Sequence, residues 1–229
     1  MSACVVLAGG LGTRLRSVLP DRPKCLAPVG AQPFLLLLLR HLAAAGVSRF
    51  VLSLGHLAQQ VEQVLRDVDI GVPVQAVVEP RPLGTGGGLL LSMAQTGLDE
   101  CLVTNGDTWL QAPLAPLLQP LHLDSGELCR MAALAVPDRG RFGGLVLQGS
   151  KVAGFKPAGA AGPGLVNAGF YRLHRRAFDG FTPGSALSLE HDVLVPLAVA
   201  GGLQAARVEG QFIDIGVPDD YRRFCDAFG

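Results

Sequence analysis

ACVVLAGG, residues 3–10, is a short apolar run that passes directly into a pair of glycines. The run predicts a buried β-strand, and the glycines predict a loop in which main-chain N–H groups can approach a ligand closely. Beyond this stretch, strand-like and helix-like segments alternate with short connections. Further strands are predicted at residues 49–54, 72–79 and 100–104, and helices at residues 33–45, 57–68 and 86–96. This alternation predicts parallel strands with helices on both faces of a sheet.

The second half of the chain has a different rhythm. Strand-like runs follow one another, separated by turns of glycine, proline and aspartate, at residues 128–136, 145–147, 151–155 and 166–173. They predict a small antiparallel β insertion, an arrangement that often forms a lid or side wall over a site. A helix at 187–200, strands at 203–208 and 211–215 and a closing helix at 217–228 complete the pattern. The predicted fold class is α/β, with an open, mostly parallel, Rossmann-like mixed sheet.

Length and composition limit the classes of protein that need to be considered. The chain has 229 residues, 49% of them hydrophobic and 17% charged, which predicts one globular domain over residues 1–229 with no further module after the closing helix. Nineteen basic residues balance nineteen acidic ones, so no broad basic surface for nucleic acid or an anionic membrane is expected. Five scattered cysteines favour reduced thiols over disulfides or a zinc site. With no leader segment and no apolar run long enough to span a bilayer, we expect a cytoplasmic protein.

Ligands of open α/β sheets bind beyond the carboxyl ends of the strands, so the loops at those ends carry the chemistry. The first is LAGGLGTRL, residues 7–15, whose glycines can direct N–H groups at an anion and whose Arg14 adds a permanent cation. It lacks the Gly-Lys-Ser/Thr ending of a Walker loop, and Leu15 stands where the dinucleotide fingerprint needs a third glycine. A tight strand-to-helix turn is the alternative interpretation.

Two more loops have a similar character. Residues 21–30, DRPKCLAPVG, hold Lys24 between prolines that stiffen the segment, although a solvated loop lysine is an equally good interpretation. Residues 79–88, EPRPLGTGGG, follow a strand and open a helix. Free N–H groups at a helix start suit a base or ribose, but a capped helix start would explain the same sequence.

Two aspartates occupy positions that suit metal binding. Asp107 follows a buried strand in VTNGDT, residues 103–108, where an isolated aspartate is more often a turn or helix cap. Asp214 lies inside an apolar strand, which is unfavourable unless a cation or a hydrogen-bond donor faces it. Two such carboxylates converging on one point would offer the oxygen ligands that Mg²⁺ prefers.

Residues 7–34, LAGGLGTRLRSVLPDRPKCLAPVGAQPF, closely resemble the opening segment of the sugar-1-phosphate nucleotidyltransferase family, and the resemblance extends over nearly the whole chain. It implies a magnesium-dependent enzyme that joins a nucleoside triphosphate to a sugar 1-phosphate and releases pyrophosphate. It also implies that Arg14 and Lys24 act on the phosphates and that Asp107 and Asp214 hold Mg²⁺. The implied nucleotide contacts are Leu7, Gly9, Gly10, Gly12, Thr13, Gly84, Thr85 and Gly86.

The same resemblance marks a sugar side. VNAGFY, residues 166–171, looks like the family's sugar-contacting segment, and SLEHD, residues 188–192, looks like its Ser-x-Glu-x-Asp helix start, although an ordinary capping box would explain that spacing too. The implied sugar-binding residues are Asn105, Asn167 and Glu190.

Two motifs suggest a particular substrate. Residues 105–108 and 212–221 look most like those of D-glycero-α-D-manno-heptose-1-phosphate guanylyltransferases, which implies GTP and that heptose 1-phosphate as substrates and GDP-heptose as product. Mannose 1-phosphate with GTP and N-acetylmuramate 1-phosphate with UTP are alternatives. In one departure, the family usually carries Glu-Lys after a Gly-Phe pair, whereas Lys156 and Pro157 follow here. The acidic sugar contact is therefore missing, and the shifted Lys156 could replace the cation.

The expected reaction requires Arg14, Lys24, Asp107 and Asp214 to converge on one cleft. A sugar phosphate oxygen would attack the α-phosphorus in line, and because this nucleophile is already anionic, positioning and electrostatics would replace a general base. A non-catalytic nucleotide-sugar-binding regulator would be expected to have lost one of these four residues. A glycosyltransferase would use an Asp-x-Asp metal motif and release no pyrophosphate. The sequence leaves the base, the sugar and the oligomeric state open.

Overall fold

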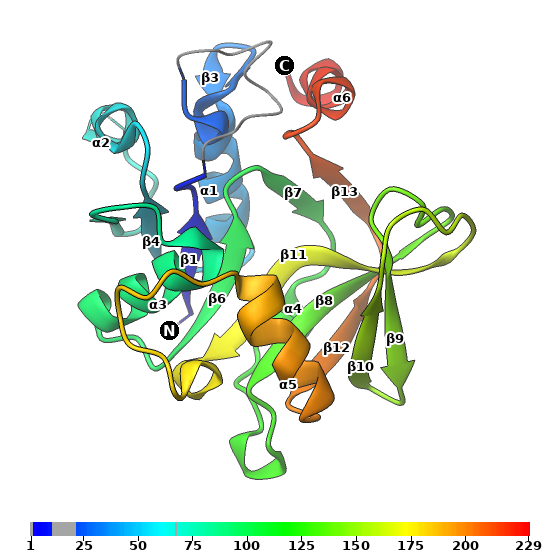
Figure 1. Cartoon of the computed structure of the whole chain (residues 1–229). Helices are drawn as coiled ribbons and strands as arrows, with labels where there is room; N and C mark the ends of the chain where they lie inside the picture. Colours follow the sequence, from blue (N-terminus) through cyan, green and yellow to red (C-terminus); the bar gives the residue numbers. More distant parts are fainter. Residues whose placement is uncertain (1, 11–21, 67) are drawn as a thin grey trace.

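The computed structural model describes residues 2–10, 22–66 and 68–229, and a nine-stranded sheet forms its centre (Figure 1). The strand order is β5-β4-β1-β6-β11-β8-β12-β10-β9. Seven of these strands run in one direction, and only β10 and β11 run against them, so the sheet is mixed and mostly parallel, as predicted. The strands are β1 (Ala3–Leu7), β4 (Arg49–Leu54), β5 (Val74–Val78), β6 (Glu100–Asn105), β8 (Cys129–Val136), β9 (Gly144–Gln148), β10 (Lys151–Lys156), β11 (Gly164–His174) and β12 (Leu203–Val208).

Helices cover both faces because successive side chains of a strand point to opposite sides. In β1, Cys4 and Val6 join a core formed with α1, α2 and α6, whereas Val5 joins a second core formed with α3 and α5. The helices are α1 (Phe34–Ala44), α2 (Ala58–Arg66), α3 (Gly84–Thr96), the single turn α4 (Ala115–Leu118), α5 (Val195–Val199) and α6 (Pro218–Phe228). Short 3₁₀ turns are η1 (Lys24–Leu26), η2 (Leu123–Ser125) and η3 (Arg175–Phe178).

Two small antiparallel sheets complete the fold. One pairs β2 (Pro28–Val29) with β3 (Gln32–Pro33), and the other pairs β7 (Thr108–Gln111) with β13 (Gln211–Asp214). Trp109 anchors the β7–β13 pair, since its ring packs against Phe34 of α1 and Phe224 of α6 at centroid distances of 6.3 and 5.2 Å. The pairing brings the chain next to Asp107 and the end of β13 together, although the two segments are distant in sequence.

The strands expected to form an insertion do not stand apart from the main sheet. β11 lies between β6 and β8 in its middle, and β9 and β10 extend its far edge. β8 and β11 are buried along most of their length, which suits central strands better than a wall. The elements separate from the main sheet are the β7–β13 and β2–β3 pairs, and of their strands only β13 was predicted.

The helix expected at residues 187–200 begins differently. A π-helical segment, η4 (Leu189–Leu194), precedes α5. Ser188 caps it, because its Oγ accepts from the N–H of His191 while its own N–H donates to Asp192 Oδ2 at 2.7 Å. Asp192, rather than Glu190, therefore closes the capping box, and Glu190 remains exposed.

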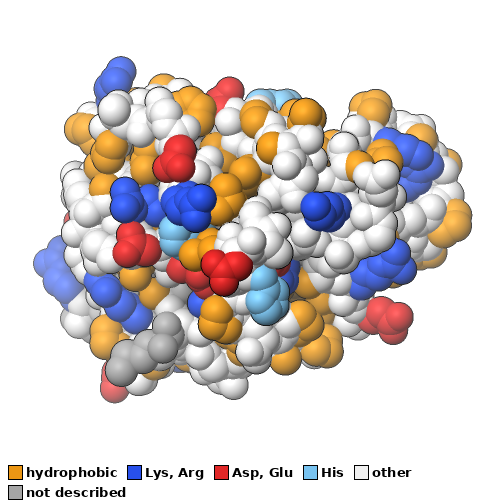
Figure 2. Space-filling model, turned by 90° about the horizontal axis from the view of Figure 1, so that it is seen from below, with side chains coloured by type: hydrophobic (Ala, Val, Ile, Leu, Met, Phe, Trp, Pro, Cys, Tyr) orange, Lys and Arg blue, Asp and Glu red, His pale blue; other side chains and the backbone are white. Residues whose placement is uncertain are grey.

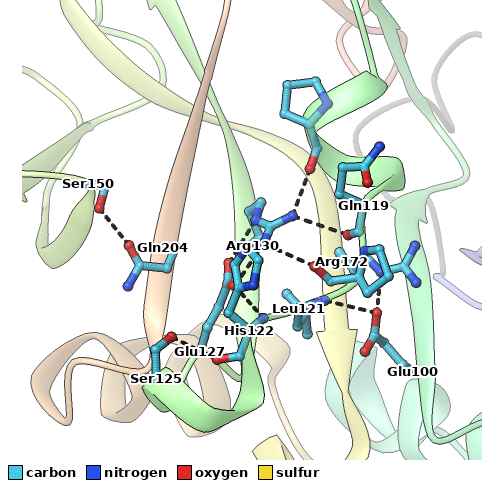
Figure 3. Close-up of polar contacts among 12 residues, drawn as sticks. Glu100, Gln119, Leu121, His122, Ser125, Glu127, Arg130, Ser150, Arg172 and Gln204 are labelled. Atoms are coloured by element: carbon cyan, nitrogen blue, oxygen red, sulfur yellow. Dashed lines mark hydrogen bonds and ion pairs between the residues drawn. The ribbon is translucent and has the colours of Figure 1, made fainter.

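A buried network of charges lies at the amino end of β6 (Figure 3). Glu127 and Arg130 form a two-pronged ion pair with both contacts at 2.7 Å, and Arg172 pairs with Glu100. The two guanidinium groups also donate to main-chain carbonyls of the segment around α4, those of Pro116, Leu118, Gln119 and Pro120. The network thus fixes this segment against β8 and β11.

The described part of the chain contains no helix that is long and apolar enough to cross a membrane. Figure 2 shows one face of the molecule, seen from below, where basic and acidic side chains lie interspersed among hydrophobic ones.

Candidate functional site

Two adjoining cavities lie beyond the carboxyl ends of the parallel strands. The larger has a volume of about 410 Å³ and the smaller about 230 Å³. Thr85, Asn105 and Asp107 line both, so the two cavities share a wall. The other residues of the larger cavity are Leu7, Ala8, Gly9, Gly10, Lys24, Cys25, Ser53, Glu79, Pro82, Gly84 and Gly106. The other residues of the smaller cavity are Thr108, Asn167, Gly169, Tyr171, Leu189, Glu190, Phe212 and Asp214.

Lys24 and two aspartates converge at the shared wall. Lys24 Nζ donates to Asp107 Oδ2 at 2.5 Å, although the residues are 83 positions apart. The Gly216 N–H donates to Asp214 Oδ1 at 2.8 Å, and a side chain at Gly216 would clash with both this oxygen and Lys24 Nζ. The sequence predicts four converging residues, and the structure brings these three together. Arg14 lies outside the described residues, as do Gly12 and Thr13.

The β7–β13 pair positions the two carboxylates. Thr108, which follows Asp107, is the register partner of Asp214, and the Ile215 N–H donates to the carbonyl of Asp107 at 3.0 Å. Mid-strand Asp214 therefore lies at the end of β13, facing the smaller cavity, instead of in the apolar core. An aspartate inside an apolar strand is unfavourable only if its carboxylate is buried without a partner. Here the Asp214 carboxylate faces a cavity and accepts from the Gly216 N–H.

The two carboxylates fit Mg²⁺ in number and in ligand chemistry. Among the described residues, no group of three or more His, Cys, Asp or Glu could hold a metal by itself. Mg²⁺ is commonly bound by one or two carboxylates, with substrate phosphates and water supplying the remaining oxygens. Asp107 and Asp214 provide that number.

The chain also contains an Asp-x-Asp triplet at residues 67–69, the type of motif that a glycosyltransferase would use. Asp69 is exposed after α2, and its Oδ1 accepts from the Gly71 N–H.

Glu79 is a functional candidate that the sequence-based prediction missed. Its carboxylate projects from the end of β5 into the larger cavity, where Oε1 lies close to Gly9 and Gly55. Oε2 accepts from the Leu83 N–H at 2.9 Å. Burial raises the pKa of this carboxyl, and the hydrogen bond from Leu83 offsets part of that rise. An acidic residue directly after a strand and before a glycine-rich loop is the signal that could have identified it.

Cys25 also lines the larger cavity, but its environment does not suit a nucleophile. The side chain is buried, and burial raises the pKa of its thiol to about 12, with the charge of Asp107 adding to the rise. The residue is therefore a neutral thiol at physiological pH.

The smaller cavity contains all three residues predicted to bind sugar, Asn105, Asn167 and Glu190. A bulge interrupts the β11–β8 register at Asn167, whose Oδ1 accepts from the Gly169 N–H at 2.9 Å and whose Nδ2 donates to the Tyr171 hydroxyl at 2.8 Å. These bonds fix the orientation of the amide at the cavity wall. Burial raises the pKa of Tyr171, so this hydroxyl stays protonated.

The glycine loop at the start of α3 only partly matches its prediction. Gly84 and Thr85 line the larger cavity, but Gly86 does not, because its N–H donates to the carbonyl of Leu187 at 2.9 Å. The Gly87 N–H donates to the same carbonyl at 3.2 Å. The segment before η4 therefore takes up two of the N–H groups at this helix start.

Lys156 is the residue that the sequence offered as a replacement for the missing cation. It lies on β10 opposite Gly144, is exposed, and is not among the residues that line either cavity.

Comparisons with known proteins show which family the chain resembles. A family model described as nucleotidyl transferase matches residues 3–227. The chain is 30% identical to a D-glycero-alpha-D-manno-heptose 1-phosphate guanylyltransferase of Aneurinibacillus thermoaerophilus, over 96% of this chain and 95% of the relative. It is 31% identical to the enzyme of the same name from Campylobacter jejuni, over 96% of this chain and 97% of the relative.

Solved structures show the same similarity. HddC from Yersinia pseudotuberculosis superposes with a TM-score of 0.85 at 31% identity, and the match covers 100% of both chains. The structure of HddC complexed with GMP-PN gives a TM-score of 0.83 at 30% identity, again over 100% of both chains.

Proposed function

The chain belongs to the nucleotidyl transferase family, and from this premise we propose that it joins GTP to D-glycero-α-D-manno-heptose 1-phosphate, releasing pyrophosphate and forming GDP-heptose. The general activity, transfer of a nucleotide to a sugar 1-phosphate, follows from the family and its guanylyltransferase relatives. The proposal concerns the base, the sugar and the residues that act. We place the reaction in a single domain over residues 1–229, working in the cytoplasm.

The shared wall of the two cavities is the observation that supports this assignment of roles. In our proposal the nucleoside triphosphate occupies the larger cavity and the sugar 1-phosphate the smaller one. The reacting phosphates then meet where Lys24, Asp107 and Asp214 converge. A binding module for one ligand would not need a second cavity that opens onto the same charged group.

The reaction forms one P–O bond and breaks another. An oxygen of the sugar 1-phosphate attacks the α-phosphorus of GTP, and the bond between the α-phosphorus and the bridging oxygen breaks, so pyrophosphate leaves with the electron pair. Lys24 neutralises charge on the phosphates that approach one another, and its ion pair with Asp107 compensates both groups before substrate arrives. Glycine amides near Gly9 and Gly10, with Arg14 and the loop residues Gly12 and Thr13, hold the triphosphate.

Asp107 and Asp214 would hold Mg²⁺, which supplies positive charge for the phosphate oxygens when it is bound. The protein's own contribution is the β7–β13 pairing, which keeps the two carboxylates at the same wall.

Glu79 supports guanine as the base. A guanine offers two neighbouring donors, N1–H and the exocyclic amino group, which a single carboxylate can accept together. A uracil or thymine offers one donor, and a carboxylate facing their carbonyl oxygens would be repelled. With Oε1 near the Gly9 and Gly55 backbone and Oε2 held by Leu83, the carboxylate has a fixed place in the larger cavity. The guanylyltransferase names of the relatives agree with this choice.

Pyrophosphate release, measured with four nucleoside triphosphates against a panel of sugar 1-phosphates, tests the proposal. We expect the highest kcat/KM with GTP and the heptose 1-phosphate. Mannose 1-phosphate belongs in the panel because a mannose-1-phosphate guanylyltransferase of Mycobacterium tuberculosis is 32% identical over 96% of this chain, although the match covers only 62% of that relative. N-acetylmuramate 1-phosphate with UTP is the remaining arm. Preference for UTP or for mannose 1-phosphate would contradict the proposed pair, and no release with any pair would favour a regulator.

A further inference from the structure

The glycine loop at the start of α3 and the segment that leads into η4 are joined by a set of hydrogen bonds. Besides the two amides that donate to Leu187 O, the Leu187 N–H donates to Leu83 O at 2.8 Å. On the outer side, Arg81 donates to the carbonyl of Gly184 at 3.1 Å. The segment before η4 therefore follows the nucleotide loop closely from residue 184 to residue 189.

Close backbone contact makes these two segments one unit. A Cβ on Gly84 would lie 2.5 Å from the carbonyl oxygen of Leu187, and one on Gly86 would lie 3.0 Å from the nitrogen of Leu189. A side chain on Gly87 would clash with the carbonyl of Ser185. The glycines at 84, 86 and 87 thus allow the second segment to pack against the main chain of the first, where neither can shift without the other.

Thr85 connects this unit to the sugar side. Its Oγ1 accepts from the N–H of Leu189, the first residue of η4, at 3.0 Å. The Asp192 and Ser188 side chains accept from the N–H groups of Ser188 and His191 at the same helix start, and Thr85 supplies a third side-chain acceptor there. The next residue, Glu190, lines the smaller cavity. The hydroxyl of Thr85 is consequently directed at the element that carries Glu190, although Thr85 belongs to the loop predicted to bind nucleotide.

We propose that Thr85 is a positioning residue for the sugar 1-phosphate: through its hydroxyl it holds the start of η4 and sets the position of Glu190. This rests on the proposed function, in which the smaller cavity takes the sugar. In this proposal Thr85 has two roles. Its backbone belongs to the nucleotide loop, and its hydroxyl positions the helix start that carries the sugar-binding Glu190.

The test compares Thr85→Val, which keeps the shape and removes the acceptor, with Thr85→Ser, which keeps the hydroxyl. Steady-state kinetics use the nucleotide and sugar 1-phosphate that the wild-type enzyme converts best. Loss of one hydrogen bond that positions a binding group should raise the KM for sugar 1-phosphate about five- to tenfold in the valine variant, with the KM for nucleotide changed less than about twofold. The serine variant should restore the wild-type KM.

A double-mutant cycle separates positioning from general damage to the fold. If Thr85 acts through Glu190, then Thr85→Val should add little to the KM for sugar 1-phosphate in a Glu190→Ala background. Thr182→Val is the matched control, since this exposed hydroxyl bonds only to Ser185 Oγ in the described structure and lines neither cavity. It should leave both KM values unchanged.

Three outcomes would overturn the inference: an unchanged KM for sugar 1-phosphate in Thr85→Val, an equal or larger rise in the KM for nucleotide, or effects of Thr85→Val and Glu190→Ala that are fully additive. Calorimetric binding of sugar 1-phosphate to wild type and Thr85→Val gives the same comparison without turnover. A wild-type protein that releases no pyrophosphate would therefore count against the proposed function, while the binding measurement would still decide the role of Thr85.

Discussion

The two ends of β6 carry ion pairs that are similarly buried but differ in how many further hydrogen bonds their cations make. At its start, Arg172 and Glu100 have side chains 10% and 19% exposed, and beyond its end Lys24 and Asp107 have side chains 13% and 25% exposed. Arg172 and its neighbour Arg130 also donate to main-chain carbonyls (Figure 3). Among the described residues, Lys24 donates only to Asp107, beside two cavities. The number of donors left for a ligand, rather than burial, distinguishes a structural charge from one available for chemistry.

The difference follows from what surrounds each pair. Around Arg130 and Arg172, the end of α4 supplies carbonyls that have no helical partner, and the guanidinium groups use them. Lys24 instead lines the larger cavity, where a ligand can meet its ammonium group. One end of the sheet should therefore respond to substitution mainly in stability, and the other mainly in turnover.

Removal of the metal should have the largest effect at the cavity end. If Asp107 and Asp214 hold Mg²⁺, chelation with EDTA should abolish pyrophosphate release, and added Mg²⁺ should restore it. Asp214→Asn should raise the Mg²⁺ concentration needed for half-maximal rate by about tenfold or more, because a neutral amide is a weaker ligand than a carboxylate. Full turnover in EDTA would contradict the assignment of a metal to these residues.

Replacing Lys24 should have the next largest effect on turnover. Lys24→Met keeps most of the unbranched side chain and removes its charge, so we expect kcat/KM to fall about 10²- to 10³-fold through lost stabilisation of the approaching phosphates. The midpoint of urea unfolding should change little. Turnover near that of wild type, measured by coupled pyrophosphate release, would remove Lys24 from the mechanism.

At the amino end of β6, a substitution should lower stability and leave turnover nearly unchanged. Arg130→Met leaves the Glu127 carboxylate and several carbonyls without their donor, which should lower the free energy of unfolding by about 3–5 kcal/mol in urea titrations. The folded fraction should keep a kcat within about twofold of wild type. The control is Arg222→Met, which breaks a surface pair whose side chains are 71% and 83% exposed and should cost less than about 1 kcal/mol. Equal losses of unfolding free energy in the two variants would contradict the structural role assigned to Arg130.

A smaller effect is expected at Glu79, where the property at stake is selectivity. Glu79→Gln should lower the preference for GTP over other nucleotides about ten- to hundredfold, through loss of charge-assisted hydrogen bonds to the base. Because burial raises the pKa of this carboxyl, its ionised form is lost earlier as pH falls, so the KM for GTP should rise on the acidic side. That rise should be absent in the glutamine variant.

The sign for stability at Glu79 is opposite to that of a paired carboxylate. Since the folded pKa lies above the ordinary value, the folded protein binds the proton more tightly than the unfolded chain. Stability should therefore decline as pH rises from the ordinary carboxyl range through the raised pKa, and Glu79→Gln should remove that decline. A KM for GTP that shows the same pH dependence in both proteins would exclude Glu79 from base recognition.

Much of the fold was predictable because it depends on local patterns. Alternating apolar segments and glycine loops located most of the strands and helices, with ends that agree within a few residues. β7 escaped prediction because its four residues are too few to show a period. The antiparallel strands were predicted, but not that β8 and β11 join the main sheet, because a run of strands in sequence does not show which strand each one will pair with. Pairing depends on surfaces that form only as the sheet assembles.

The sequence by itself determined the alternation of elements, the glycine loops at the strand ends, and the type of side chain offered there: a lysine, two aspartates and two asparagines. Only the tertiary structure decided which of these groups meet, that Glu79 enters the larger cavity, and that Gly86 and Gly87 direct their amides at Leu187. The physical reason is that a polar group is available for a ligand only if folding leaves it without a full set of partners. Those partners come from residues as distant in the chain as Lys24 and Asp107.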